Sequence, residues 1–474
     1  NVYGYSIPGV PGVIIGFNEH ISWGLTNGST DVRDYYKLEL REDYSEYKID
    51  NEWNKTDLTV EEIQIKNQDP FYDTIFYTQH GPIMMDNNFN MDKRILNYSM
   101  KWSLHEPSNE FLTFIKLNRA KDYDEFKDAI KYYQSPVQNF AYADVEGNIA
   151  LHLQGDVDKK TWNGQGKFIL DGTKSEHIAV ENLTKDLPSV LNPEAGFVCS
   201  ANNNPFKDLD SFYVNGHFDE VRSNKINAIL SDITEGDLEQ MKTIQLNNTN
   251  RFAEIALPIL ISFVEKSESD LVTELKDWDF TYNQSSIMAL IFEQWWKLIE
   301  LNTWDELHRI DFFRRNPDDL VLLELIKEEP NNLFFDMLST EKREDASDIV
   351  IRSLVGVASE HFGKKMIEWG DTNKLELNHL LALEPLSIRE LKSSGHPHAI
   401  NALRKNWGPS LRFIVEMSER PRAYGIYSGG QSGNSGSGEY DSFVDDWSKG
   451  EYYELKLYLN YLEAKNEAKY TWSF

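Results

Sequence analysis

The chain has 474 residues, too many for a single small module, and 40% of them are hydrophobic and 13% aromatic, which excludes bulk disorder. Acidic residues number 77 against 48 basic ones, a formal net charge of −29, which argues against nucleic acid as the main partner because phosphate binding requires a basic surface. No apolar run approaches the roughly 20 residues of a membrane span, and the single cysteine, Cys199, excludes a disulfide framework and a cysteine-based zinc site.

Short β segments separated by turns are expected over the first two hundred or so residues. Three runs carry this pattern: 10–16, 74–77 and 147–152. Two helices interrupt them, at about 109–120 and 123–133.

From residue 220 to about 401, apolar residues recur at three- and four-residue spacing, which predicts helices. The best examples are 256–264, 287–301 and 320–326, and the Trp295–Trp296 pair is interpreted as core packing. A mixed tail follows, in which the glycine- and serine-rich run 428–438 has the composition of a flexible linker. This order predicts an α+β fold with a helical insertion, divided into 1–220, 221–400 and 401–474, and not alternating βαβ units.

Two carboxylates close a Gly/Asn-rich turn near the N-terminus. Asp31 and Asp34 lie on either side of Arg33 and follow a Trp-Gly-Leu-Thr-Asn run that ends at Asn27. Carboxylate and carbonyl oxygens in one short loop can hold calcium, which takes six to eight oxygen ligands. Solvated loop acids are the alternative.

An asparagine cluster, Ala201–Pro205, precedes Arg222, which leads into a predicted helix. An asparagine amide is a neutral donor suited to a developing oxyanion, whereas an Asx turn is the simpler interpretation. The run 143–149 is interpreted as a hairpin turn, and His396-Pro397-His398 as a loop turn, with a metal-binding pair as the alternative.

These clusters, taken in order, closely resemble the penicillin acylase (penicillin amidase) family of N-terminal nucleophile hydrolases. The resemblance extends over nearly the whole chain, and no single motif would carry it alone. Its motifs are the run Pro8–Asp34, His80-Gly81-Pro82, Gln138-Asn139, Tyr142-Ala143-Asp144, Gly147-Asn148-Ile149, Asn192-Pro193, Gly196, Ala201-Asn202-Asn203, Arg222, Ile226, Trp407-Gly408-Pro409-Ser410, Gly430-Gln431-Ser432-Gly433-Asn434, Tyr440-Asp441 and Trp447.

The resemblance implies a four-layer αββα sandwich with a mostly helical insertion, and it implies the roles of particular residues. The Asn202 side chain and the Asn27 backbone N–H match the oxyanion hole, and Arg222 matches an active-site arginine. A structural calcium ion is expected at the family's metal loop, whose matching residues are Asp31, Arg33 (through its carbonyl), Asp34 and, with different spacing, Asp210. In this family the 428–438 run is an ordered loop, which replaces the linker interpretation.

The family's nucleophile is the first residue of the large chain, usually a serine, whose own α-amine acts as the base. Asn1 has no nucleophilic side chain, and the start of the sequence has no initiator methionine or targeting signal. We therefore expect a large chain without its first few dozen residues, inactive alone, whose nucleophile lies upstream of Asn1. The expected partner is a small chain cut from the same precursor.

The leading functional hypothesis is an amidohydrolase acting on a small-molecule N-acyl substrate, such as a penicillin side chain or an N-acyl homoserine lactone. A non-catalytic binding protein of the same fold is the second hypothesis, and an acidic sugar-binding or sugar-cleaving protein is the third. The acidic composition suggests a periplasmic or extracellular location.

Overall fold

The computed structural model describes residues 1–84, 97–160, 164–177, 187–206, 214–265, 269–310, 315–361 and 363–468. The chain forms two compact units. The first comprises 1–223, 415–422 and 456–474, and the second comprises 224–414 and 423–455. Of the three segments expected from the sequence, 401–474 is therefore shared between the units.

A six-stranded antiparallel sheet is the centre of the first unit. Its strands lie in the order β1-β2-β3-β11-β12-β14, with bounds Val2–Tyr5, Ile15–Asn18, Ile21–Asn27, Gln138–Asp144, Ile149–Gln154 and Ser189–Leu191. The expected strand at 10–16 is wrong over most of its length, because the chain turns at Gly9 and Gly12, whose φ angles are +88° and +96°. The strand starts at Ile15, after the bend at Gly12, and Gly16 lies within it.

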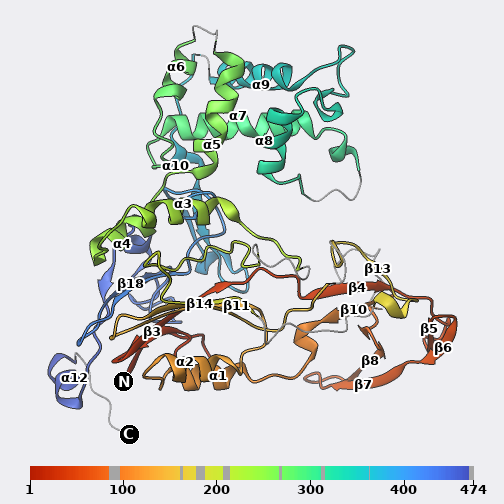
Figure 1. The fold of residues 1–474 in the computed structure, drawn as a ribbon, viewed down its shortest axis with the longest axis vertical. Helices are drawn as coiled ribbons and strands as arrows, with labels where there is room; N and C mark the ends of the chain where they lie inside the picture. The colour runs from red at the N-terminus through yellow and green to blue at the C-terminus, as the bar shows by residue number, and fades with distance from the viewer. Residues whose placement is uncertain are drawn as a thin grey trace. The chain divides into compact units, whose positions relative to one another are not determined.

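Two short helices, α1 (Glu110–Leu117) and α2 (Tyr123–Ile130), cover one face of this sheet, below β3 and β11 in Figure 1. Each begins at a side-chain cap: Asn109 accepts from the Leu112 amide, and Asp122 from the Glu125 amide. The apolar faces pack onto the sheet in one core, formed by Ile21, Trp23, Phe114, Leu117, Ala120, Phe126, Ala129, Ile130, Tyr133, Phe140, Tyr142 and Ala150. Both helices fall where the sequence predicts them.

Smaller sheets complete the first unit. The order β10-β4-β13 joins Tyr98–Trp102, Arg33–Lys37 and Leu170–Asp171, with β13 parallel to β4. The remaining strands form a two-stranded β5-β6 sheet and a three-stranded β7-β8-β9 sheet, with bounds Glu46–Ile49, Glu52–Lys55, Asp57–Ile63, Phe71–Thr78 and Gly81–Pro82. Helix α12 (Tyr461–Glu467) also belongs to this unit.

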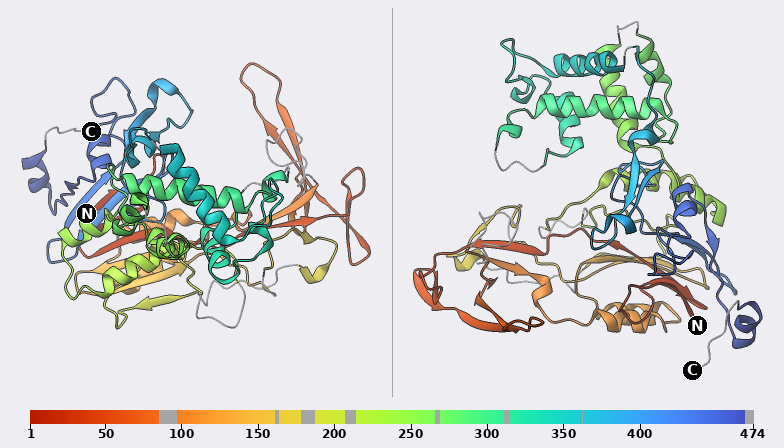
Figure 2. Two further views of the ribbon diagram at one scale, coloured as in Figure 1. Left: turned by 90° about the horizontal axis from the view of Figure 1, so that it is seen from above. Right: turned by 180° about the vertical axis from the view of Figure 1, so that it is seen from behind.

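The helical block predicted from residue 220 is present. Helix α3 (Glu220–Ser231) leads into it, and the others are α4 (Leu238–Gln245), α5 (Arg251–Val264), α6 (Asp270–Asp277), α7 (Ile287–Thr303), α8 (Asp319–Glu328), α9 (Ala346–His361) and α10 (Trp369–Thr372). Figure 2 shows α5, α7 and α9 gathered in one green-to-teal bundle. Trp295 and Trp296 are buried there, and the Trp295 indole N–H donates to the Val350 carbonyl at 3.0 Å. Their interpretation as core residues is confirmed.

Two small sheets and a helix follow in the chain, and strands β17 and β18 cross the boundary between the second unit and the first. The sheets pair β15 with β16 and join β17-β18-β19, and the helix is α11 (Val444–Lys449). The strand bounds are Lys374–Leu377, Ile388–Lys392, Leu411–Glu416, Arg422–Tyr427 and Tyr453–Glu454.

The glycine-rich loop at 428–438 is closed by its own hydrogen bonds. The Ser432 amide donates to the Glu439 carbonyl at 3.1 Å, and the Tyr427 hydroxyl donates to the Gly430 carbonyl at 2.6 Å. The linker interpretation from composition is therefore wrong here. In the part of the chain that the structure describes, no helix combines the length and the apolar character needed to cross a membrane.

Candidate functional site

Asn27 lies at the end of β3 and is exposed. The Gly28 amide donates to the Val137 carbonyl of the neighbouring chain segment at 2.9 Å. Because N–H groups alternate in direction along an antiparallel ladder, the Asn27 N–H points away from β11. The side chain of Asn27 is also fixed, since its Oδ1 accepts from Gln138 Nε2 at 2.8 Å.

Asn202 comes to this strand end from a position 175 residues later in the chain. Its Nδ2 donates to the Asn27 carbonyl at 3.0 Å, and Asn139 Nδ2 donates to the same carbonyl at 3.2 Å. Asn202 has a left-handed backbone with φ +66°, a conformation that asparagine adopts more readily than most residues. The structure thus brings the two predicted oxyanion-hole residues together.

The Asx-turn alternative applies to Asn204, whereas Asn203 bonds back to the amide of a preceding residue. Asn203 Oδ1 accepts from the Ala201 amide at 3.2 Å, and Asn204 Oδ1 accepts from the Phe206 amide at 2.9 Å. Both side chains shape the loop locally. The Asn202 side chain instead reaches across to β3.

Arg222, on the first turn of α3, fixes the orientation of the Asn202 amide. One guanidinium nitrogen donates to Asn202 Oδ1 at 2.9 Å and to the Ala201 carbonyl at 3.1 Å. Arg222 Nε in turn donates to Asp219 Oδ2 at 2.9 Å. Since the guanidinium only donates, the oxygen of the Asn202 amide must face it and the NH₂ group must face Asn27. That NH₂ group carries a second N–H besides the one bound to Asn27.

Cys199 lies three positions before Asn202 and is the one thiol in the chain. Burial raises the pKa of its thiol to about 11, and the Arg222 guanidinium only partly opposes this effect. The thiol is therefore protonated at neutral pH, and Cys199 is a poor candidate for a nucleophile.

A lysine ammonium from a distant part of the chain contacts the two acids of the predicted metal loop. Lys160 Nζ lies 2.9 Å from Asp34 Oδ2 and 3.5 Å from Asp31 Oδ2. Burial works to lower the pKa of Lys160, but the attraction of the Asp34 and Asp31 carboxylates outweighs it and raises that pKa above its ordinary value. The Arg33 amide donates to Asp31 Oδ1 at 3.2 Å.

The calcium ion itself stays a prediction, because Asp210 lies outside the described residues. In the described chain, no group of three or more His, Cys, Asp or Glu side chains is arranged to hold a metal. Asp31 and Asp34 do converge, but a cationic nitrogen already contacts both of them. The described part of this cluster therefore fits an ammonium better than calcium, which needs six to eight oxygens.

His396 and His398 are engaged in hydrogen bonds with acids and an amide. His396 contacts Glu293 Oε1 at 3.1 Å through Nε2 and Asn250 Nδ2 at 3.0 Å through Nδ1. His398 Nε2 lies 2.9 Å from Asp319 Oδ2. These contacts tie the 396–398 loop to the helices of the second unit.

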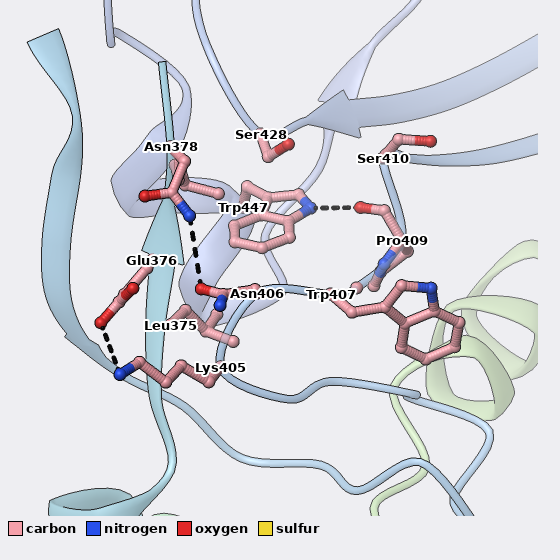
Figure 3. A pocket seen from close by; sticks show the side chains of 12 residues that line it. Leu375, Glu376, Asn378, Lys405, Asn406, Trp407, Pro409, Ser410, Ser428 and Trp447 are labelled. Carbon is pink, nitrogen blue, oxygen red and sulfur yellow. Dashed lines mark hydrogen bonds and ion pairs between the residues drawn. The ribbon is translucent and has the colours of Figure 1, made fainter. Parts of the chain in front are cut away.

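A cavity of about 370 Å³ lies within the second unit, and Figure 3 shows its lining. The Trp407–Ser410 segment borders it, and the Trp447 indole N–H donates to the Pro409 carbonyl at 3.0 Å. Lys405 pairs with Glu376 at 3.0 Å. None of the predicted catalytic or metal-binding residues lines this cavity.

Comparison with known proteins agrees with the resemblance seen in the sequence. The sequence profile described as penicillin amidase matches residues 1–464. The chain belongs to the penicillin amidase family. The acyl-homoserine lactone acylase QuiP of Pseudomonas aeruginosa is 24% identical over 95% of this chain. Penicillin G acylase of Escherichia coli is 29% identical over 43% of this chain and 24% of its own length.

A solved structure of a thermostable penicillin G acylase from Alcaligenes faecalis matches with a TM-score of 0.72 and 18% identity, over 100% of this chain and 91% of that one. The mixed α+β fold of the N-terminal nucleophile hydrolases is thereby confirmed. This chain spans 61% of the length of the Pseudomonas aeruginosa acylase, so it covers less than two thirds of that relative.

Sequence reasoning assigned no role to four residues that the structure places at these sites: Gln138, Asn139, Lys160 and Asp219. Gln138 and Asn139 belong to a motif of the penicillin amidase family, which was a usable signal. Lys160 lies 126 residues from Asp34 in the chain, and no local pattern marks it.

Proposed function

We propose that this member of the penicillin amidase family is an amidohydrolase that removes the acyl group from an N-acyl compound. The observation that carries the proposal is the arrangement of Asn27, Asn202 and Arg222. Two donors, the second N–H of the Asn202 amide and the Asn27 backbone N–H, serve the oxyanion of the tetrahedral intermediate. Their positions are set before substrate binds, which is the condition for strong electrostatic stabilisation.

The proposed nucleophile is the N-terminal serine of the mature large chain, upstream of Asn1, with its own α-amine as general base. An amine with a pKa near 8 can accept the hydroxyl proton at close range and return it to the leaving amine. The small chain from the same precursor is the proposed partner and contributes to the acyl pocket. The 474-residue chain alone is then inactive. A periplasmic or extracellular location stays a prediction.

The relatives suggest which acyl compounds to test. They include proteins named acyl-homoserine lactone acylase and penicillin G acylase. We propose N-acyl homoserine lactones as the first substrate class, because the matches to acyl-homoserine lactone acylase QuiP extend over about 95% of this chain, against 43% for the penicillin G acylase.

The test is release of free amine from N-acyl homoserine lactones of several chain lengths and from phenylacetyl amides. Both the full-length gene product and the 474-residue chain are assayed. We expect turnover by the full-length product and none by the 474-residue chain. Binding of acyl compounds without turnover by the full-length product would favour the non-catalytic hypothesis. Equal turnover by both proteins would place the nucleophile within the 474 residues and refute the proposed mechanism.

A further inference from the structure

The two acids of the metal loop share one buried cation that belongs to the protein. Lys160 Nζ contacts Asp34 Oδ2 and Asp31 Oδ2. The Lys160 and Asp34 side chains are each 1% exposed, and the Asp31 side chain is 19% exposed. We propose that the Lys160 ammonium takes the place of calcium in this chain, so that the Asp31–Asp34 loop folds without a divalent ion.

Charge compensation is the first reason. Carboxylates removed from water need a countercharge or hydrogen bonds, because an unpaired buried charge is strongly destabilising. Asp31 Oδ2 and Asp34 Oδ1 are buried and receive no hydrogen bond from the described residues. The Lys160 ammonium, 2.9 Å from Asp34 Oδ2 and 3.5 Å from Asp31 Oδ2, is the countercharge in the described chain that contacts both carboxylates, although neither of the two orphaned oxygens accepts a hydrogen bond from it.

Mutual exclusion is the second reason. A calcium ion binds carboxylate oxygens at 2.3–2.6 Å. An ion on Asp31 Oδ2 and Asp34 Oδ2 would share both oxygens with Lys160 Nζ and would lie only a few ångströms from it. Two cations at that separation in a buried site repel each other strongly. Calcium could enter only if the lysine side chain left.

The backbone of Gly166 is the third reason, because it closes another side of the cluster. A Cβ added at Gly166 would lie 2.3 Å from Asp31 Oδ2, 2.6 Å from Asp34 Oδ1 and 3.2 Å from Lys160 Nζ. Its φ of +90° also favours glycine. The chain thus packs directly against the carboxylate oxygens that further calcium ligands would have to approach.

The experiment uses the full-length gene product and two readouts that do not depend on amide hydrolysis. Elemental analysis gives the calcium content, and thermal unfolding gives Tm in excess calcium and in excess EGTA. We expect no bound calcium and the same Tm in both conditions. One calcium ion per chain that is lost in Asp31→Asn, with a lower Tm in EGTA, would overturn the proposal.

A lysine variant tests the reverse effect. Lys160→Met should lower Tm by about 5 °C or more, because breaking one side of a buried ion pair leaves an unpaired charge. Added calcium should raise the Tm of Lys160→Met part of the way back to the wild-type value, and it should leave the Tm of the wild type unchanged. Lys116→Met is the matched control, because it breaks the exposed Lys116–Asp128 pair and should leave Tm nearly unchanged. An unchanged Tm in Lys160→Met would refute the role of the ammonium as countercharge to Asp31 and Asp34. If Lys160→Met does not fold, the calcium content of the wild type and its Tm in calcium and in EGTA test the proposal.

Discussion

Replacement of Asn202 is the most direct test of the candidate site. Its amide donates one N–H to the Asn27 carbonyl at 3.0 Å, and Arg222 holds its oxygen at 2.9 Å. Asn202→Ala removes the second N–H, which we assign to the oxyanion. Loss of one such donor lowers kcat by about 10²–10³, equivalent to about 2.7–4 kcal/mol of transition-state stabilisation. The KM should change far less, since the ground-state carbonyl carries little charge.

The assay is amine release at saturating substrate by the full-length gene product, with Tm measured for each variant. Asn202→Gly is a second variant, because glycine adopts the φ of +66° without strain and separates a backbone effect from the lost donor. Asn203→Ala is the matched control, since its Oδ1 accepts only a local bond from the Ala201 amide in the described contacts. An unchanged kcat in both Asn202 variants, or a change confined to KM, would remove Asn202 from the oxyanion hole.

Three further outcomes are expected. Arg222→Met frees the Asn202 amide to rotate and should lower kcat by about tenfold or more, while KM changes less. Arg222→Lys should not restore kcat, because one ammonium cannot reproduce the contacts of the guanidinium with Asn202, Ala201 and Asp219. Burial lowers the pKa of His152 from its ordinary 6.5 to about 4. Between pH 6.5 and 4 the imidazole of His152 is therefore protonated in the unfolded state and neutral in the folded state. The free energy of unfolding should fall by about 1–2 kcal/mol as pH drops from 6.5 to 4. His152→Gln should remove this contribution to the pH dependence of stability. Phe126→Ala should lower that free energy by about 3–5 kcal/mol in denaturant titration, whereas Phe111→Ala, 51% exposed, should leave it almost unchanged.

Local patterns were sufficient for the helices, whereas the choice of family needed the order of motifs along nearly the whole chain. Helix α2 could be predicted because its cap, Asp122, and its apolar spacing lie within one short segment. The patterns that predicted part of strand β8 and the helical block are likewise contained in short segments of the chain. The strand expected at 10–16 was misplaced because an apolar run does not reveal where glycine will turn the chain.

The sequence, through its resemblance to the penicillin amidase family, predicted which side chains could do the chemistry: two asparagines and an arginine as donors, and a pair of aspartates as a cation site. The tertiary structure decided which of them meet. Asn27 and Asn202 are 175 positions apart, and Asp34 and Lys160 are 126 positions apart. Contacts at such separations follow from how the sheet and its connecting segments pack, and no local propensity encodes them. For that reason the sequence predicted a calcium loop, and only the fold placed a lysine ammonium between its two acids.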